Sequence, residues 1–325
     1  MSWANLRASL FFFLAANLLA QAQVTVPGPA SAALHSTDPS SEVAITTISK
    51  RVDEVNLVFT VTDRKGRFVR NLTQQEVNVL DNHEPPQSVS YFQSQTDLPL
   101  KAALVIDLSD SITQRFDFEK KAAAIFLKNI LRSESDAGIV IGFDSRVHLL
   151  QPLTSDKDRL GAAVQSMLAG GETALYDAVV SACEKLREAD ETNVSRRAII
   201  LVTDGADNRS RKTLEEAQDA ALRSGVVIYA ISTNPWSTPT LGDKVLNSMT
   251  LASGGRVLPG HSSKDVSRAF AKLEEELRSQ YAMGYKPANL EKGSVLRKIE
   301  LTSLRKKLRV HCRKEYYAGN RGLRY

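Results

Sequence analysis

Oxygen-bearing side chains gather in three short segments, each at the end of a predicted strand or the start of a predicted helix. The segments are Asp107–Ser111, Gly170–Asp177 and Asp204–Asp207, and none of them contains cysteine or histidine. Carboxylate and hydroxyl oxygens are the ligands that hard divalent cations such as Mg²⁺ and Mn²⁺ prefer. The three segments therefore indicate an all-oxygen cation site. The two cysteines of the chain exclude a cysteine-based zinc cluster.

The spacing in the first segment supports this interpretation. In a strand-to-loop-to-helix turn, Asp107, Ser109 and Ser111 can converge while the side chains between them point away. Serine hydroxyls are neutral ligands, so a bound ion keeps much of its positive charge. Because Mg²⁺ prefers six oxygens, such an ion attracts a carboxylate from another molecule as its last ligand.

A regular alternation of strands and helices positions these segments. Continuous apolar runs predict buried strands at 102–107, 137–143, 197–204 and 225–232, with helical segments of period 3.6 between them. Residues 146–150 predict one antiparallel edge strand. This pattern predicts a doubly wound α/β domain, whose mostly parallel sheet is covered on both faces. In such sheets ligands bind outside the carboxyl ends of the strands, where the first and third segments fall.

Shorter strands flank this domain on both sides. Residues 52–92 alternate apolar and polar side chains between turns, and strand character returns after Gln280. The second group is too small to fold alone, so we predict that both groups form one small β-sandwich-like module into which the α/β domain is inserted. The predicted limits are a signal peptide at 1–22, a flexible linker at 23–49, the β module at 50–97 and 281–318, the α/β domain at 98–280 and a basic tail at 319–325.

The three segments also carry a family resemblance. In chain order they contain Asp-x-Ser-x-Ser, Gly-Gly-x-Thr-x-Leu-Tyr-Asp and Thr-Asp-Gly, and together they resemble the von Willebrand factor type A domain. The resemblance implies a Rossmann-like fold and a metal-ion-dependent adhesion site (MIDAS) whose metal residues are Asp107, Ser109, Ser111, Thr173 and Asp204. In the family the serines and the threonine bind the ion directly, and the aspartates often act through water. This chain differs by an extra acid, Asp110, inside the first loop.

The N-terminus has the features of a secretory signal. Arg7 supplies a positive charge, Ala8–Ala20 is an apolar run, and small residues at Ala20 and Ala22 fit a cleavage site after Ala22. The run is shorter than the ~20 residues of a spanning helix; an uncleaved anchor is the alternative. With a signal, β strands, an A domain and a Tyr-x-x-Gly-Tyr-x-Pro tail, the chain looks like secreted bacterial A-domain proteins. We therefore predict a secreted or periplasmic protein.

Several other side chains have structural interpretations. We expect Asp110 and Asp207 to be solvated loop acids, and Asp177 to accept hydrogen bonds from a loop backbone. Cys183 and Cys312 fall at inward positions of a predicted helix and a predicted strand, so we expect two buried core residues. The sequence leaves open whether they pair.

The net charge of +5 conceals an asymmetry. Residues 286–325 hold twelve Lys and Arg against three Asp and Glu, whereas residues 1–285 carry a net charge of −4. The basic C-terminal region is an alternative functional element, which would bind a polyanion or a membrane surface through groups such as Arg305–Lys307. Nucleic acid is not an expected partner of an exported chain.

These observations predict an exported, metal-dependent adhesion or protein-binding module that holds Mg²⁺ or Mn²⁺ and docks an Asp or Glu of a partner protein onto the ion. The alternative is a metal-dependent hydrolase that uses the same acids. No His or Lys lies within the three segments to act as a general base, and no Gly-x-Ser-x-Gly, phosphate-binding or dinucleotide motif is present. Glu172 is the single candidate base, so we expect no enzymatic activity.

Overall fold

The computed structural model describes residues 54–94, 98–109, 116–132, 135–188, 195–236, 238–289 and 295–318. All of them belong to one compact unit, Arg51–Tyr325, which contains a six-stranded sheet and two smaller sheets. The predicted signal peptide, linker and basic tail lie outside the described residues, as do Asp110 and Ser111. Among the described residues, no helix is long and apolar enough to cross a membrane.

The six-stranded sheet has the order β6-β5-β4-β7-β8-β9, and neighbouring strands run parallel except β5 and β6. Its strands are β4 (Leu100–Asp107), β5 (Ala137–Phe143), β6 (Val147–Thr154), β7 (Arg196–Thr203), β8 (Val226–Ser232) and β9 (Val257–Pro259). Every residue of β5 and β7 is buried, which explains their continuous apolar runs in the sequence. The sequence pattern did not indicate β9, which has only three residues.

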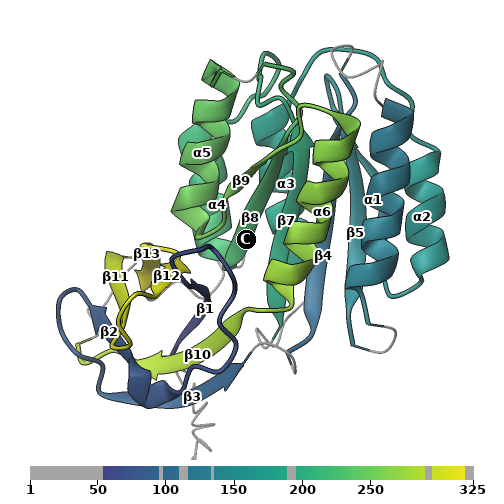
Figure 1. Ribbon diagram of the computed structural model, residues 1–325. Coiled ribbons are helices and arrows are strands. Elements are labelled where there is room, and N and C mark those ends of the chain that lie inside the picture. The colour runs from purple at the N-terminus through teal and green to yellow at the C-terminus, as the bar shows by residue number, and fades with distance from the viewer. Residues whose placement is uncertain are drawn as a thin grey trace, which may run out of the picture. The chain divides into compact units, whose positions relative to one another are not determined.

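Three helices cover each face of this sheet (Figure 1). One face packs against α1 (Phe116–Ile130), α2 (Lys157–Gln165) and α6 (Ser263–Leu277), and the other against α3 (Leu175–Glu188), α4 (Leu214–Ser224) and α5 (Leu241–Ser253). An apolar core lies between the sheet and the helices on each face. Side chains of β4 alternate between the two cores: Leu104 and Ile106 belong to one, and Ala103 and Val105 to the other. The predicted doubly wound α/β fold is confirmed.

Strands from both sides of this domain pair with each other. One antiparallel sheet has the order β12-β1-β10-β3 and the other β13-β11-β2. Since β1 and β3 pair with β10, and β2 pairs with β11, the α/β domain is inserted into one antiparallel module, as predicted. The domain limits themselves stay a prediction. The elements of this β module are β1 (Val55–Thr62), the 3₁₀ turn η1 (Gln74–Glu76), β2 (Val77–Asp81), β3 (Ser88–Ser94), β10 (Tyr281–Lys286), β11 (Val295–Ser303), β12 (Arg309–Cys312) and β13 (Glu315–Ala318).

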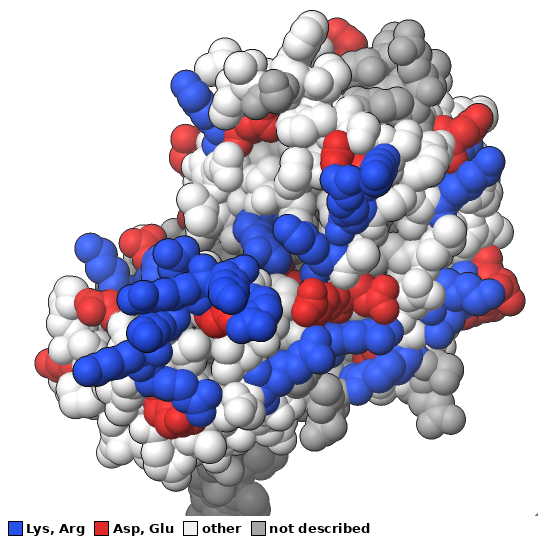
Figure 2. All heavy atoms as spheres, in the orientation of Figure 1, with Lys and Arg blue, Asp and Glu red and all other residues white. Residues whose placement is uncertain are grey.

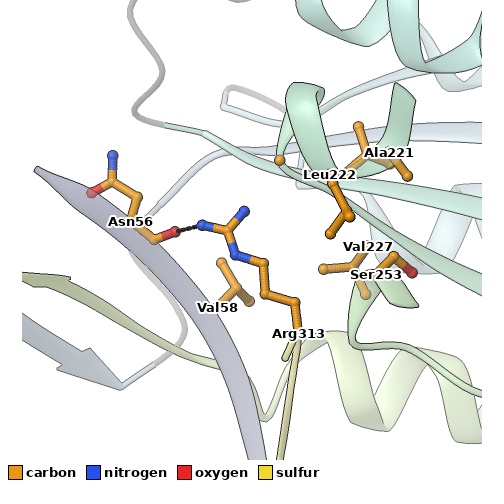
Figure 3. Close-up of a pocket in the computed structure, with 9 residues that line it drawn as sticks. Asn56, Val58, Ala221, Leu222, Val227, Ser253 and Arg313 are labelled. Atoms are coloured by element: carbon orange, nitrogen blue, oxygen red, sulfur yellow. Dashed lines mark hydrogen bonds between the residues drawn. The ribbon is translucent and has the colours of Figure 1, made fainter. Parts of the chain in front are cut away.

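A pocket marks the place where β1 meets α4 and the start of β8 (Figure 3). Arg313 lines it and donates from Nη2 to the carbonyl oxygen of Asn56 at 2.7 Å. Nearby, the Tyr317 hydroxyl donates to Asp219 of α4 at 2.8 Å. The pocket lies at the amino end of β8, whereas the oxygen-rich segments follow the carboxyl ends of β4 and β7. These contacts join the β module to the α/β domain, away from the candidate site.

Two smaller predictions also have an outcome. Cys183 in α3 and Cys312 in β12 are buried free thiols, so the expected core placement is confirmed and they form no disulfide. Arg305–Lys307 lies in the connection between β11 and β12, where Lys307 has a φ of 72°. Arg305, which the sequence offered for binding a polyanion, is paired within the chain, because its Nη2 lies 2.7 Å from Glu76 Oε1.

Candidate metal centre

The first loop begins at the carboxyl end of β4. Asp107 is its last residue and has no exposed surface, and Ser109 is also buried. Asp107 Oδ1 accepts a hydrogen bond from the Ser109 backbone N–H at 2.9 Å, and Oδ2 accepts one from the Thr203 hydroxyl at 2.6 Å. Thr203 is the last residue of the neighbouring strand β7, so the pairing of β4 with β7 brings the first and third loops together.

The surroundings of the Asp107 carboxyl group determine the direction of its pKa shift. Burial raises its pKa, the hydrogen bonds from Thr203 and Ser109 oppose this rise, and the charge of Asp204 adds to it. Among the described residues, the groups that shift this pKa include no Lys or Arg. A cation placed between Asp107 and Asp204 would stabilise both carboxylates.

Backbone hydrogen bonds hold the second loop between the other two. The Gly170 N–H donates to the carbonyl oxygen of Leu108 at 2.6 Å, which ties the second loop to the first. Thr173 is buried, and its backbone N–H donates to Asn208 Oδ1 at 2.9 Å. Its carbonyl oxygen accepts from the Asn208 and Arg209 N–H groups at 3.0 and 3.1 Å. Hydrogen bonds from the segment that follows β7 thus hold the loop that carries Thr173.

The third loop follows β7 and needs its glycine. Half-buried Asp204 accepts a hydrogen bond from the Ala206 N–H on Oδ1 at 2.9 Å, so the chain turns tightly around its side chain. Gly205 has a φ of +84°, and a Cβ there would lie 2.4 Å from the carbonyl oxygen of Gly242 in α5. Only glycine fits this conformation and this close approach. The loop geometry therefore requires the glycine of the Thr-Asp-Gly sequence.

A family model described as von Willebrand factor type A domain matches residues 102–206, which include all five predicted metal residues. The chain is a von Willebrand factor type A (VWA) domain protein. This confirms the resemblance found in the sequence for the domain itself. The resemblance to secreted bacterial members stays a prediction.

Known proteins are similar to this VWA protein over part of its length. Calcium-activated chloride channel regulator 1 of Bos taurus is 28% identical over 176 residues, which are 52% of this chain and 18% of that protein. The chain thus matches less than a fifth of the length of this relative.

Two solved structures are similar to parts of the chain. Proximal thread matrix protein 1 of the mussel byssus, with a zinc-occupied MIDAS motif, is 22% identical, with a TM-score of 0.48 over 61% of this chain and 49% of that one. A von Willebrand factor type A protein of Catenulispora acidiphila is 12% identical, with a TM-score of 0.47 over 81% of this chain and 72% of that one.

The VWA domain also orders the start of α3 through residues of the third loop. Asp207 Oδ1 accepts from the Leu175 N–H at 2.8 Å, and the Ser210 hydroxyl oxygen accepts from the Tyr176 N–H at 2.9 Å. The expectation that Asp207 is a solvated loop acid was wrong, because it caps this helix. Asp177 accepts from the backbone N–H of Lys212 at 2.9 Å, as the sequence predicted. Both acids have structural partners and need no metal role.

Groups suited to proton transfer lie beside the second loop. Glu172 Oε2 lies 2.8 Å from Arg209 Nε, so the acid that the sequence offered as a general base is paired with a cation. His148 Nε2 lies 3.0 Å from Asp144 Oδ2, and the Asp144 carbonyl oxygen accepts from the Ala174 N–H at 2.7 Å. The sequence analysis did not identify this pair, in which Asp144 lies in the turn before β6 and His148 lies within β6.

The predicted site is thus described in part. Asp107 accepts a hydrogen bond from Ser109, and the charge of Asp204 raises its pKa. Loop contacts bring Thr173 to the same edge, and Ser111 lies outside the described residues. Within the described ranges, no three His, Cys, Asp or Glu side chains form a group that could hold a metal. A cation here would depend on hydroxyl donors together with two carboxylates, which suits a hard ion. Sequence reasoning missed Thr203 and Asn208, whose partners lie far along the chain.

Proposed function

We propose that this VWA domain binds Mg²⁺ or Mn²⁺ and uses the ion to bind a partner protein through an Asp or Glu side chain. The proposed ligands are Asp107, Ser109, Ser111, Thr173 and Asp204. One observation carries the proposal: the charge of Asp204 helps to raise the pKa of the fully buried Asp107, and no cationic side chain among the described residues shifts this pKa. Buried charges in proteins are normally paired or bound to metal.

The donor types explain how the ion would act. Three of the five proposed ligands are hydroxyl groups, which leave most of the ion's charge uncompensated. When bound, the cation supplies an electrophilic point for a carboxylate of another molecule. The chain itself contributes the orientation, because Thr203 and the Ser109 N–H hold Asp107 in place and Asn208 holds the Thr173 loop.

Binding rather than catalysis is the function that we propose. Glu172 is paired with Arg209, which weakens it as a base for the alternative hydrolase. The His148–Asp144 pair is the feature that favours this alternative, and hydrolysis of ester substrates with and without Mg²⁺ would test it. We also propose that the protein is exported, secreted or periplasmic, on the strength of its N-terminal sequence.

The basic C-terminal region gives the second candidate, binding of a polyanion or membrane surface. Figure 2 shows Lys and Arg side chains gathered over the β module, with acidic side chains between them. Part of this charge is paired: Arg305 with Glu76, and buried Arg297 with Asp81. Such pairing reduces the charge left for a polyanion, and we keep this candidate second. It would show as binding that salt weakens and EDTA leaves unchanged.

Metal-dependent stability tests the proposal. The melting temperature of the full chain is measured in EDTA, in Mg²⁺ and in Mn²⁺. A ligand at 100 times its Kd stabilises the folded state by ~2.7 kcal/mol, which gives a clear upward shift. The double variant Thr173→Ala, Asp204→Ala should melt at the same temperature with and without metal.

A matched control uses the same residue types at exposed positions outside the three loops. The double variant Asp158→Ala, Thr302→Ala should keep the wild-type metal shift. A wild-type chain that does not shift at millimolar Mg²⁺ or Mn²⁺ would contradict the proposal. So would an equal shift in the Thr173, Asp204 variant.

A further inference from the structure

Three large apolar side chains stand out by their exposure. Leu168 is 83% exposed, Leu241 78% and Trp236 67%, and these are the highest values for large apolar residues in the described part of the chain. Each lies in, or at the end of, a connection at the carboxyl edge of the parallel sheet, the edge that holds the candidate metal centre. We refer to these three residues as the apolar rim.

Backbone contacts of nearby glycines place two rim residues close to the metal loops. Leu168 comes two residues before Gly170, whose N–H donates to Leu108, the residue between Asp107 and Ser109. Leu241 precedes Gly242, and a Cβ on Gly242 would lie 2.2 Å from the carbonyl oxygen of Asp204. The rim therefore lies on both sides of the proposed metal residues.

The loop that presents Trp236 is held by a buried polar network. The Trp236 N–H donates to Asn234 Oδ1 at 3.1 Å, and Asn234 is buried. Asn234 Nδ2 donates to Asp243 Oδ2 at 2.7 Å, and Asp243 Oδ1 accepts from the Ser232 hydroxyl at 2.6 Å. The network lies beneath the loop, so the indole is exposed on an ordered segment. An ordered segment with an exposed indole is typical of a binding surface.

The charge around this edge also favours an apolar partner. On the face that Figure 2 shows, the described surface beyond α5 and α6 carries fewer Lys and Arg side chains than the β module. Arg209, which lies beside Thr173, is paired with Glu172. A protein segment could place a carboxylate at the metal and apolar side chains on the rim.

We propose that the partner of this site is a protein segment in which one Asp or Glu is flanked on both sides by apolar side chains. The inference rests on the proposed function, since the acid would bind the cation. It adds that Leu168, Trp236 and Leu241 contact the flanking residues and select them. Each such contact removes apolar surface of both molecules from water.

The probes are three capped peptides: Glu between two pairs of leucines, Glu between two pairs of serines, and Gln between two pairs of leucines. The chain has two tryptophans, so the full chain with Trp3→Phe reports on Trp236 by its fluorescence. In Mg²⁺, the Leu-flanked Glu peptide should bind about tenfold more tightly than either of the others. EDTA should abolish its binding.

Rim variants with a matched control complete the experiment. Leu168→Ser and Leu241→Ser should each weaken the Leu-flanked Glu peptide about tenfold and leave the Ser-flanked peptide unchanged. Leu251→Ser should have no effect, because Leu251 is 63% exposed but lies about 15 Å further along α5. All three variants should keep the Mg²⁺-dependent melting shift.

The outcomes separate this inference from the proposed function. If Mg²⁺ shifts the melting temperature but the peptides bind equally, or none binds, the apolar rim is not the recognition surface. Binding of the Leu-flanked peptide that persists in EDTA, or that Leu251→Ser weakens as much as Leu241→Ser, also overturns the inference. A chain without a metal shift fails the proposed function itself.

Discussion

Asp81 in the β module and Asp107 in the VWA domain have the same position in their strands but opposite surroundings. Each is the last residue of a strand, and they are 1% and 0% exposed. Asp81 accepts from Arg297 Nε at 2.6 Å and from the Tyr285 and Tyr316 hydroxyls at 2.9 and 2.7 Å. Asp107 accepts from neutral groups and lies near a second acid, Asp204.

The difference shows what each aspartate does. Asp81, Arg297, Tyr285 and Tyr316 come from β2, β11, β10 and β13, so their cluster ties the two small sheets together. The β module is small, and a paired buried charge of this kind gives it a specific arrangement. The VWA domain has two large apolar cores and needs no such cluster. The cation that we propose would compensate its buried acid, Asp107, whose pKa is shifted by no Lys or Arg among the described residues.

Among the variants that test this comparison, Asp81→Ala is expected to change the free energy of unfolding most. The substitution leaves the Arg297 charge buried without its partner, which costs about 3–5 kcal/mol of the free energy of unfolding. Urea unfolding measures the loss. Asp63→Ala is the control, because Asp63 pairs with Arg67 at the surface, and its loss should be far smaller. Equal losses for both variants would mean that the buried cluster has no special role.

The next effect concerns Asp107→Asn. The neutral amide removes a buried charge and its repulsion with Asp204, so the melting temperature in EDTA should not fall below that of the wild type. The Mg²⁺ shift of ~2.7 kcal/mol at 100 times Kd should disappear. A large destabilisation in EDTA would show instead that Asp107, like Asp81, is a structural acid.

The same residue predicts a pH dependence. The pKa of Asp107 is raised in the folded state. Between pH 3.8 and the raised pKa, the folded chain therefore keeps a proton that the unfolded chain has released. In EDTA its contribution to the free energy of unfolding should therefore fall as the pH rises from 3.8 through the raised pKa. Unfolding curves of wild type and Asp107→Asn should diverge over this range. Parallel curves would contradict the raised pKa of Asp107.

Thr203→Val tests the hydrogen bond that holds Asp107. The valine keeps the shape but cannot donate to Asp107 Oδ2, and a hydrogen bond to a charged group contributes about 1.5–3 kcal/mol. We expect a loss at the lower end of this range and a weaker affinity for Mg²⁺, measured by titration calorimetry. Thr233→Val, at the next residue after β8, is the control and should leave the affinity unchanged. An unchanged affinity in Thr203→Val would mean that Asp107 needs no positioning.

The smallest effect is expected from Glu172→Gln. Glu172 and Arg209 are about half exposed, and exposed ion pairs contribute little to stability. The free energy of unfolding and the Mg²⁺ shift should stay at their wild-type values. A metal-dependent hydrolytic activity that this variant loses would revive the alternative function.

Much of the fold could be predicted because its signals are local. The apolar runs of β4, β5, β7 and β8 and the helical period of α1 and α6 appear within single segments of the chain. The insertion of the α/β domain could be predicted from the return of strand character after Gln280. Strands β9 and β13 are three and four residues long and carry too little pattern to be recognised.

The supporting residues of the site could not be predicted in this way. Thr203 and Asp107 are 96 positions apart, and Thr173 and Asn208 are 35 apart. Their contacts depend on which strands are neighbours and on the register between them. The exposure of Trp236 depends likewise on the network beneath its loop. Such facts are properties of the folded chain.

The sequence by itself determined the type of chemistry, because the five proposed metal residues are oxygen donors in three ordered motifs. It also determined the strand and helix periods that place these motifs at the carboxyl edge of the parallel sheet. Only the tertiary structure decided which buried acid has a cationic partner among the described residues. Asp81 and Asp107 are both strand-end aspartates, and their difference arises from Arg297, which lies 216 positions from Asp81, and from the Asp204 carboxylate near Asp107. The free energy of a buried charge depends on the groups around it, and these are brought together only by folding.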